Sequence, residues 1–193
     1  RESSLTDITI DGCQNLTSLD LSKNLLTDFA LNGLTPLEYL NLDDNRITNS
    51  VSENSTLTLE NCGATLTNLR ISNNPGLRCL DIRYLTVLEY LSANNNPDLG
   101  SVFICPPEEE QATLRSISIN DCALAHFYPV SLPNLRTLDL ANNELESGIT
   151  DADPFTLGNY PNLTVLNVSG NANIRELDVT KCKLLEQLHV YGC

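Results

Sequence analysis

The chain has 193 residues, of which 41% are hydrophobic and 5% aromatic, and it carries a formal net charge of −14. The hydrophobic content suffices for one continuous core, whereas the acidic excess argues against a nucleic-acid partner, because phosphate binding depends on clustered Lys and Arg. No stretch reaches the roughly 18 consecutive apolar residues of a membrane-spanning helix, so no membrane span is expected in this chain.

A leading half-turn over residues 1–15 opens the chain, with apolar side chains at a spacing that later segments share. From residue 16 onward a nine-residue pattern, LxxLxLxxN, recurs eight times, with Ile, Val or Ala accepted at the apolar positions and Cys at the last. The copies begin at Leu16, Leu37, Leu66, Leu88, Leu114, Leu135, Leu163 and Leu185. Such repeats predict a solenoid, because stacked turns bury an apolar layer that one repeat could not bury alone.

The LxL part of each repeat predicts a short β-strand, because residues two apart point to the same face of a strand. Eight strands are expected around residues 20, 41, 70, 92, 118, 139, 167 and 189, in one parallel sheet that follows the sequence order. Helix signals are sparse, and the best of them, Pro107 followed by three Glu residues, predicts no more than a short helical turn. The expected fold is therefore a right-handed solenoid with a parallel sheet on its concave face and little helix.

The spacing of the repeats indicates an internal duplication within a single domain of residues 1–193. The four repeat starts of the second half follow their counterparts in the first half by 98, 98, 97 and 97 residues. The duplicated blocks are residues 16–113 and 114–193. Each block holds one long insertion, at 48–62 and 146–160, and their equivalence predicts that both insertions have similar conformations and protrude from the same side.

The ninth position of each repeat predicts an internal ladder of hydrogen bonds. Its residues are Asn24, Asn45, Asn74, Asn96, Cys122, Asn143, Asn171 and Cys193. An Asn amide at this position can bond to backbone groups of its own and the adjacent repeat that would otherwise be buried without partners. Cys can replace Asn there as a small apolar residue with a weak donor.

The seven cysteines include no CxxC pair, so a zinc site is not expected. Cys122 and Cys193 occupy the ladder, and Cys13 and Cys182 occupy the matching site of the second half-turn. Because these sites point into the core, the thiols are expected to be mainly reduced and buried.

The repeats resemble the leucine-rich-repeat family over nearly the whole chain. The half-turns LRCLDIRYL (77–85) and IRELDVTKC (174–182), together with Cys in the ladder, are similar to the short repeats of bacterial surface proteins, the J-type internalins and related Bacteroidetes proteins. The resemblance implies a protein that is extracellular or displayed on a cell surface and that binds partner proteins. The two insertions and the irregular turn lengths depart from the family pattern.

Positions three, five, seven and eight of each repeat are expected to project from the outer face of the sheet into solvent. Contact hot spots are enriched in Tyr and Arg, so the second to fourth repeats offer the best candidates for a binding patch. These candidates are Tyr39, Asn41, Asp43, Asn68, Arg70, Tyr90 and Asn94. The competing interpretation is an ordinary solvated sheet face that carries incidental aromatic residues.

The residue content favours binding over catalysis. His126 and His189 lie in different repeats, and no nucleophile is paired with a base. Acidic pairs such as Asp43 and Asp44 lack the six or more oxygen ligands of a calcium site, so neither a metal nor a cofactor is expected. The predicted function is protein–protein recognition through the concave face, with a glycan as an alternative ligand; the alternative function is a structural spacer that presents a neighbouring domain.

The chain stops at Cys193, on the ladder position of its last repeat, and no polar cap follows. Terminal repeats of solenoids normally carry a polar outer face. We therefore expect that the natural protein continues beyond this residue, or that the edge self-associates with Leu185, Leu188 and Val190 near the contact.

Overall fold

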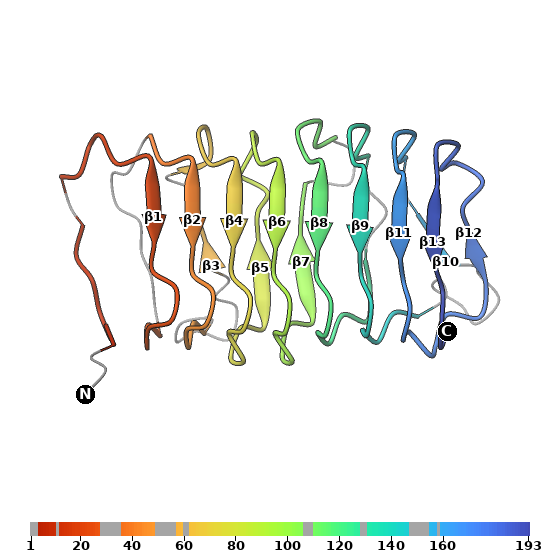
Figure 1. The fold of residues 1–193 in the computed structure, drawn as a ribbon, viewed down its shortest axis with the longest axis horizontal. Helices are drawn as coiled ribbons and strands as arrows, with labels where there is room; N and C mark the ends of the chain where they lie inside the picture. The colour runs from red at the N-terminus through yellow and green to blue at the C-terminus, as the bar shows by residue number, and fades with distance from the viewer. Residues whose placement is uncertain are drawn as a thin grey trace.

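The computed structural model describes residues 4–10, 12–27, 36–48, 57–59, 62–105, 110–127, 131–146, 155–157 and 159–193. Eight strands form one parallel sheet in sequence order, here called the long sheet (Figure 1). Its strands are β1 (Ser18–Asp20), β2 (Tyr39–Asn41), β4 (Asn68–Arg70), β6 (Tyr90–Ser92), β8 (Ser116–Ser118), β9 (Thr137–Asp139), β11 (Val165–Asn167) and β13 (Gln187–His189). The predicted sheet is confirmed, with each strand centred one residue earlier than expected. No α-helix occurs among the described residues, and the helical turn predicted at Pro107 lies outside them.

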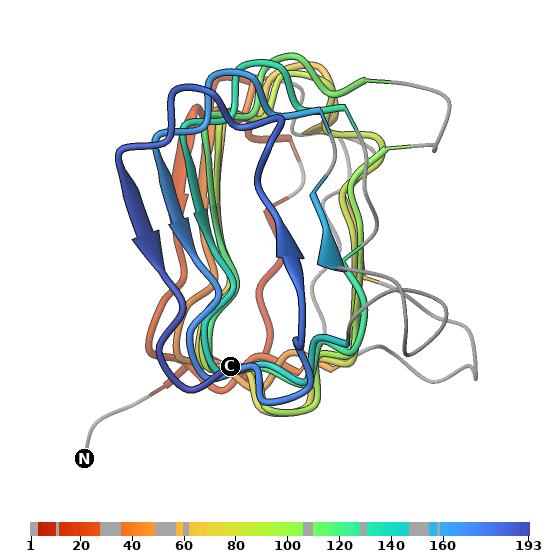
Figure 2. The same ribbon diagram turned by 90° about the vertical axis from the view of Figure 1, so that its right-hand side faces the viewer.

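A second layer of strands lies opposite the long sheet. β3 (Leu57–Thr58), β5 (Cys79–Asp81) and β7 (Ser101–Phe103) form one small parallel sheet, and β10 (Phe155–Thr156) and β12 (Leu177–Asp178) form another. Figure 2 shows the two layers facing each other across the core, with the end strands of the long sheet displaced outward from the middle ones, so that its outer face is shallowly concave. The sequence pattern predicted the strands of the long sheet but not the strands of this second layer.

Leucine side chains fill the space between the layers. Leu40 of β2, Leu69 of β4 and Leu80 of β5 are almost completely buried. Parallel pairing places Leu40 beside Leu69, so equivalent side chains stack from repeat to repeat. Each buried Leu stabilises the fold by about 1.5–3 kcal/mol relative to an exposed one, and the stack forms one continuous core.

The predicted ladder of ninth positions is confirmed. The Nδ2 group of Asn45 donates to the carbonyl of Leu21 in the preceding repeat at 2.9 Å, and its Oδ1 accepts from the backbone N–H of Leu26 at 3.1 Å. Where Cys122 replaces Asn, its Sγ lies 3.3 Å from the carbonyl oxygen of Ala93. Each Asn therefore joins neighbouring turns, and Cys keeps part of that bonding.

No disulfide joins the seven cysteines, all of which lie among the described residues, but not all of them are buried. Cys62, Cys122 and Cys182 are buried, whereas Cys13 and Cys193 are exposed and the remaining two are partly buried. The expectation of burial is thus wrong for Cys13 of the leading half-turn and for Cys193 of the ladder. The physical reason is their position at the ends of the array, where no adjacent turn of the chain covers them.

The two insertions contain short strands at equivalent positions of the predicted blocks. Leu57 of β3 pairs with Leu80 of β5, and Phe155 of β10 pairs with Leu177 of β12. Each insertion therefore ends in a short strand that joins the second layer at an equivalent place. Most of both insertions lies outside the described residues, so their shared direction of protrusion stays a prediction.

Position eight of each repeat forms a turn with a left-handed backbone. The residues with positive φ at this position are Lys23, Asp44, Asn73, Asn95, Asp121, Asn142, Gly170 and Gly192. Gly, Asn and Asp adopt this conformation most readily, which explains why they predominate here. These residues therefore shape the turn that follows each strand of the long sheet, in addition to lying near its outer face.

The apolar layer of the last repeat is exposed. Leu188 and Val190 are exposed on and beside β13, and Leu185 is partly buried. Continuation of the natural protein, or self-association through this edge, stays a prediction.

Candidate binding face

The outer face of the long sheet is built by positions three, five and seven of the repeats. Parallel pairing aligns these positions in rows: Tyr39 is beside Asn68, Asn68 is beside Tyr90, and Asn41 is beside Arg70. Neighbouring strands lie about 4.8 Å apart. The candidate residues of β2, β4 and β6 therefore come together in one patch, here called the first-block patch.

Arg70 and two tyrosines are the anchors of the first-block patch. The side chain of Arg70 is 50% exposed, Tyr90 is 44% exposed, and Tyr39 is partly buried. The two tyrosines flank Asn68 from both sides, and their backbones are about 10 Å apart because one strand separates them. The Oδ1 of Asn68 accepts a hydrogen bond from Oγ1 of Thr67 at 2.8 Å, which restricts the orientation of the amide.

An ion pair fixes the orientation of Arg70. Its Nε donates to Oδ2 of Asp43 at 2.8 Å, and its Nη2 lies 2.6 Å from the same oxygen. The other carboxylate oxygen of Asp43 accepts from the backbone N–H of Ser72 at 2.7 Å. The hydrogen bond that Arg70 donates to Asp43 raises the pKa of Arg70, so the guanidinium stays charged and is held in place with part of its surface open to solvent.

Asn41 and Asp43 do not project into solvent as predicted. Their exposed fractions are 8% and 5%. The Oδ1 of Asn41 accepts from the backbone N–H of Asp43 at 3.0 Å, and the long side chain of Arg70 reaches across from the next repeat to the Asp43 carboxylate. The prediction of direct contact is therefore corrected for both residues, which position Arg70 and the turn but offer little surface to a partner.

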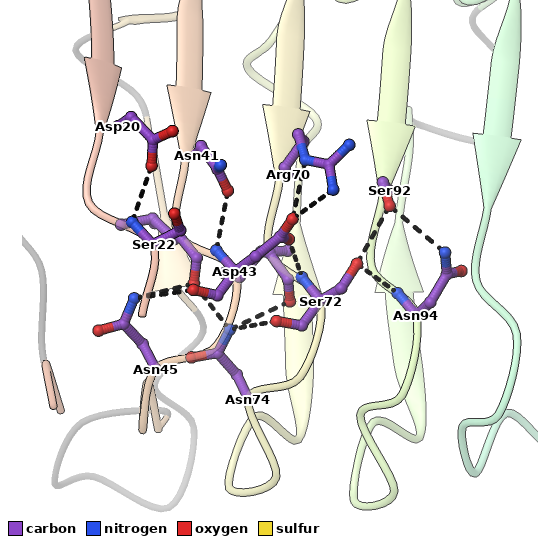
Figure 3. A network of polar contacts seen from close by, with 12 residues as sticks. Asp20, Ser22, Asn41, Asp43, Asn45, Arg70, Ser72, Asn74, Ser92 and Asn94 are labelled. Atoms are coloured by element: carbon purple, nitrogen blue, oxygen red, sulfur yellow. Dashed lines mark hydrogen bonds and ion pairs between the residues drawn. The ribbon is translucent and has the colours of Figure 1, made fainter. Parts of the chain in front are cut away.

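Asn94 belongs to a polar network that continues from the ion pair (Figure 3). Its backbone N–H donates to Oγ of Ser72 at 3.1 Å, and that hydroxyl lies 3.0 Å from Oγ of Ser92. Its Oδ1 accepts from Oγ of Ser118 at 2.9 Å, which carries the network into the next repeat. Such connected side chains are restricted before a partner arrives, and this lowers the entropy cost of binding.

Asp20 adds a negative charge at the amino-terminal side of the patch. Its Oδ1 accepts from the backbone N–H of Ser22 at 2.9 Å. Hydrogen bonds from Ser22 hold the pKa of Asp20 below its usual value. The carboxylate is therefore ionised at neutral pH, and it is exposed to solvent.

The second block lacks the anchors of the first-block patch. The equivalent residues in the two blocks are Tyr39 and Thr137, Asp43 and Ala141, Asn68 and Val165, Arg70 and Asn167, and Tyr90 and Gln187. Both blocks nevertheless form strands of the same sheet. The anchors are therefore not required by the fold. Aligning the two halves of the sequence shows that these residues differ between the blocks, so the sequence alone could have singled them out.

The groups considered for catalysis are not brought together. His126 follows β8, whereas His189 lies in β13, three strands further along the sheet. Within the described ranges, no group of three or more His, Cys, Asp or Glu residues could hold a metal ion. Burial raises the pKa of the Cys122 thiol to about 11, so this thiol is protonated at neutral pH and is a poor nucleophile.

Two family models match the chain, and both describe the repeat read from the sequence. A model described as "Leucine rich repeat" matches residues 2–47, and one described as "Leucine Rich repeats (2 copies)" matches residues 133–179. Both matches support the assignment of the chain to the leucine-rich-repeat family. The solenoid of this leucine-rich-repeat protein suggests a protein-interaction module, and such modules are typically not catalytic.

Curated proteins provide no match to this leucine-rich-repeat chain. In the part of the chain that the structure describes, no helix has the length and apolar character needed to cross a membrane. The repeat family, the fold and the chemistry of the first-block patch therefore carry the functional inference.

Proposed function

We propose that this leucine-rich-repeat protein binds a protein partner through the first-block patch. The observation that carries the proposal is the guanidinium of Arg70, fixed by Asp43 and placed near two tyrosines on neighbouring strands. Tyr and Arg are among the residues most enriched at binding hot spots. Because the Arg70 side chain is ordered before contact, less conformational entropy is lost on binding.

The shape and charge of the patch favour a protein ligand with basic side chains. Small-molecule sites usually enclose most of their ligand, whereas the long sheet offers a shallow face (Figure 2). Asp20 supplies an exposed carboxylate next to the patch, and the net charge of −14 attracts cationic partners over a longer range. Two functions compete with this proposal: binding of a glycan, and a purely structural role as a spacer. The experiment must distinguish both from binding of a protein.

The proposed location is outside the cell or on its surface. The support is the resemblance of the half-turns at 77–85 and 174–182 to those of bacterial surface proteins. Fractionation of the source cells, followed by detection with an antibody against this chain, tests the location. Detection in the medium or in the surface fraction is expected, and an exclusively intracellular pool would contradict it.

Photo-crosslinking from equivalent positions of the two blocks tests the binding proposal. A photoreactive phenylalanine analogue replaces Asn68 in one variant and Val165 in the other, and each is irradiated with proteins from the natural surroundings of the molecule. We expect a discrete protein adduct from position 68 only. The triple variant Y39T/R70N/Y90Q, which introduces the residues of the second block, should lose that adduct without unfolding.

Three outcomes would count against the proposal. Equal adducts from both positions would show that the first-block patch is not selective. A retained adduct in the folded triple variant would show that the anchors do not contribute. A missing protein adduct, whether or not a glycan binds, would favour the competing functions.

A further inference from the structure

The second layer carries exposed aromatic residues that the first-block patch does not explain. Phe103 ends β7 and lies beside Asp81 of β5 in the parallel register. The guanidinium carbon of Arg83 is 5.4 Å from the centre of the Phe103 ring, within the range of a cation–π contact. Tyr84 is 49% exposed and Phe103 is 38% exposed. Arg83, Tyr84 and Phe103 therefore form a second contact-prone surface, here called the Arg83 patch.

Asp81 holds Arg83 against this surface. The Nε of Arg83 donates to Oδ1 of Asp81 at 3.0 Å, and Nη2 donates to Oδ2 at 2.6 Å. The Asp81 side chain is only 3% exposed, whereas the Arg83 side chain is 45% exposed. No hydrogen bond from Nη1 of Arg83 is found within the described part of the chain, so two N–H groups remain available for an external acceptor.

The second block shows that the local turn does not need arginine. Asp178 is the counterpart of Asp81, and Thr180 is the counterpart of Arg83. The Oδ1 of Asp81 accepts from the backbone N–H of Arg83 at 3.1 Å, and the Oδ1 of Asp178 accepts from that of Thr180 at 2.8 Å. The same aspartate turn therefore forms with Arg or with Thr, and the arginine is free to serve another purpose.

Charge limits what can dock on the Arg83 patch. Asp81 already neutralises Arg83, so a partner carboxylate would add an unbalanced negative charge to a chain with a net charge of −14. A partner cation would face the guanidinium, and no exposed carboxylate among the three residues of the Arg83 patch offsets this repulsion, unlike Asp20 beside the first-block patch. Uncharged acceptors such as backbone carbonyl groups suit the free N–H groups, and uncharged rings suit the exposed faces of Tyr84 and Phe103.

Proline-rich segments combine both features. In the polyproline II conformation their backbone carbonyls stay unpaired, and their rings dock on surfaces lined by aromatic residues. We propose that Arg83, Tyr84 and Phe103 form a docking surface for an uncharged proline-rich segment of a partner protein. This surface belongs to the second layer and is distinct from the first-block patch on the long sheet (Figure 1).

Titration of the ¹⁵N-labelled chain with synthetic peptides, followed by NMR, tests this proposal. The probe is an acetylated and amidated peptide of three Ala-Pro-Pro units, and the controls carry Glu or Lys in place of each Ala. We expect saturable shifts for residues 81–84 and 101–103 with the neutral peptide, and weaker binding of both charged peptides. The variant R83T/Y84K, which introduces the second-block residues, should weaken binding by about tenfold or more.

The variant R70N is the matched control, because it changes an exposed arginine of the other surface and should leave peptide binding unchanged. If R83T/Y84K does not fold, the shift map of the unmodified protein decides alone. Absence of saturable shifts at millimolar peptide, tighter binding of the Glu peptide, or shifts confined to the long sheet would each overturn the proposal. None of these results bears on the photo-crosslinking from position 68, so the two proposals fail separately.

Discussion

At the scale of single residues, one buried amide in most repeats connects neighbouring turns. The Nδ2 of Asn143 donates to the carbonyls of Ile119 at 2.7 Å and Leu140 at 3.0 Å, and its Oδ1 accepts from the backbone N–H of Leu124 at 3.1 Å. The substitution Asn143→Ala removes the partners of the Ile119 carbonyl and the Leu124 N–H, at about 1–3 kcal/mol each when nothing relaxes, whereas the Leu140 carbonyl still accepts from Nδ2 of Asn171 at 2.9 Å. We expect a loss of about 2–4 kcal/mol in the free energy of unfolding, measured by urea denaturation.

The matched control is Asn159→Ala, because Asn159 is exposed and, within the described residues, its amide makes only a 3.5 Å contact with Ser131. This variant should lie within about 0.5 kcal/mol of the unmodified protein. Equal effects of the two substitutions would contradict the role of the ladder.

The left-handed turn makes a second prediction for a single residue. Lys23 has a φ of 59° at the position that Asn, Asp or Gly fills in the other repeats. Because Asn adopts this conformation with less strain than Lys, Lys23→Asn should raise the free energy of unfolding by about 0.5 kcal/mol. Lys181→Asn makes the same change of charge at an exposed residue that has no positive φ, and it should not stabilise. A destabilised Lys23→Asn variant would show that the lysine has another role.

At the scale of elements, the strands of the long sheet followed from the LxL pattern, whereas those of the second layer did not. Leu77, Leu80 and Ile82 have the same apolar spacing as the LxxLxL part of each repeat. Without a known pairing partner, however, such a triplet can form either a turn or a strand. This segment forms a strand, β5, because it pairs with β3 on one side and β7 on the other. Those partners come from an insertion and from the next repeat, which the local pattern does not specify.

The candidate site could be predicted in part for a similar reason. The strand phase placed Tyr39, Arg70 and Tyr90 on the outer face correctly, because position within a strand fixes side-chain direction. The burial of Asp43 was missed, since it depends on how Arg70 reaches across from the next repeat. Contacts between long side chains of different repeats are not encoded by spacing alone, and the contact of Arg83 with Phe103 was missed on the same grounds.

The second layer should contribute as much to the core as the long sheet does. Leu80 of β5 and Leu69 of β4 are both almost completely buried, so Leu80→Ala and Leu69→Ala should each destabilise the protein by about 2–5 kcal/mol. Leu184→Ala is the control, because Leu184 is 54% exposed. A small effect of Leu80→Ala beside a large effect of Leu69→Ala would mean that the second layer is loosely packed.

At the scale of the whole molecule, the net charge of −14 should oppose the folded state through self-repulsion. Raising the ionic strength from 0.01 to 0.15 M shortens the Debye length from about 30 to about 8 Å and screens this repulsion. We expect the midpoint of thermal unfolding to rise by about 2–4 °C, corresponding to about 1 kcal/mol. A lower midpoint in sodium chloride would show that attractive ion pairs outweigh the repulsion.

The central claim is that recognition depends on the anchors of the first-block patch and not on the repeat scaffold alone. Its most direct test is calorimetric titration of the partner captured from position 68 against the unmodified chain and against Y39T/R70N/Y90Q. We expect the affinity to fall by about a hundredfold or more in the triple variant, with R83T/Y84K binding as the unmodified chain does. An unchanged affinity in a folded Y39T/R70N/Y90Q protein would contradict the claim.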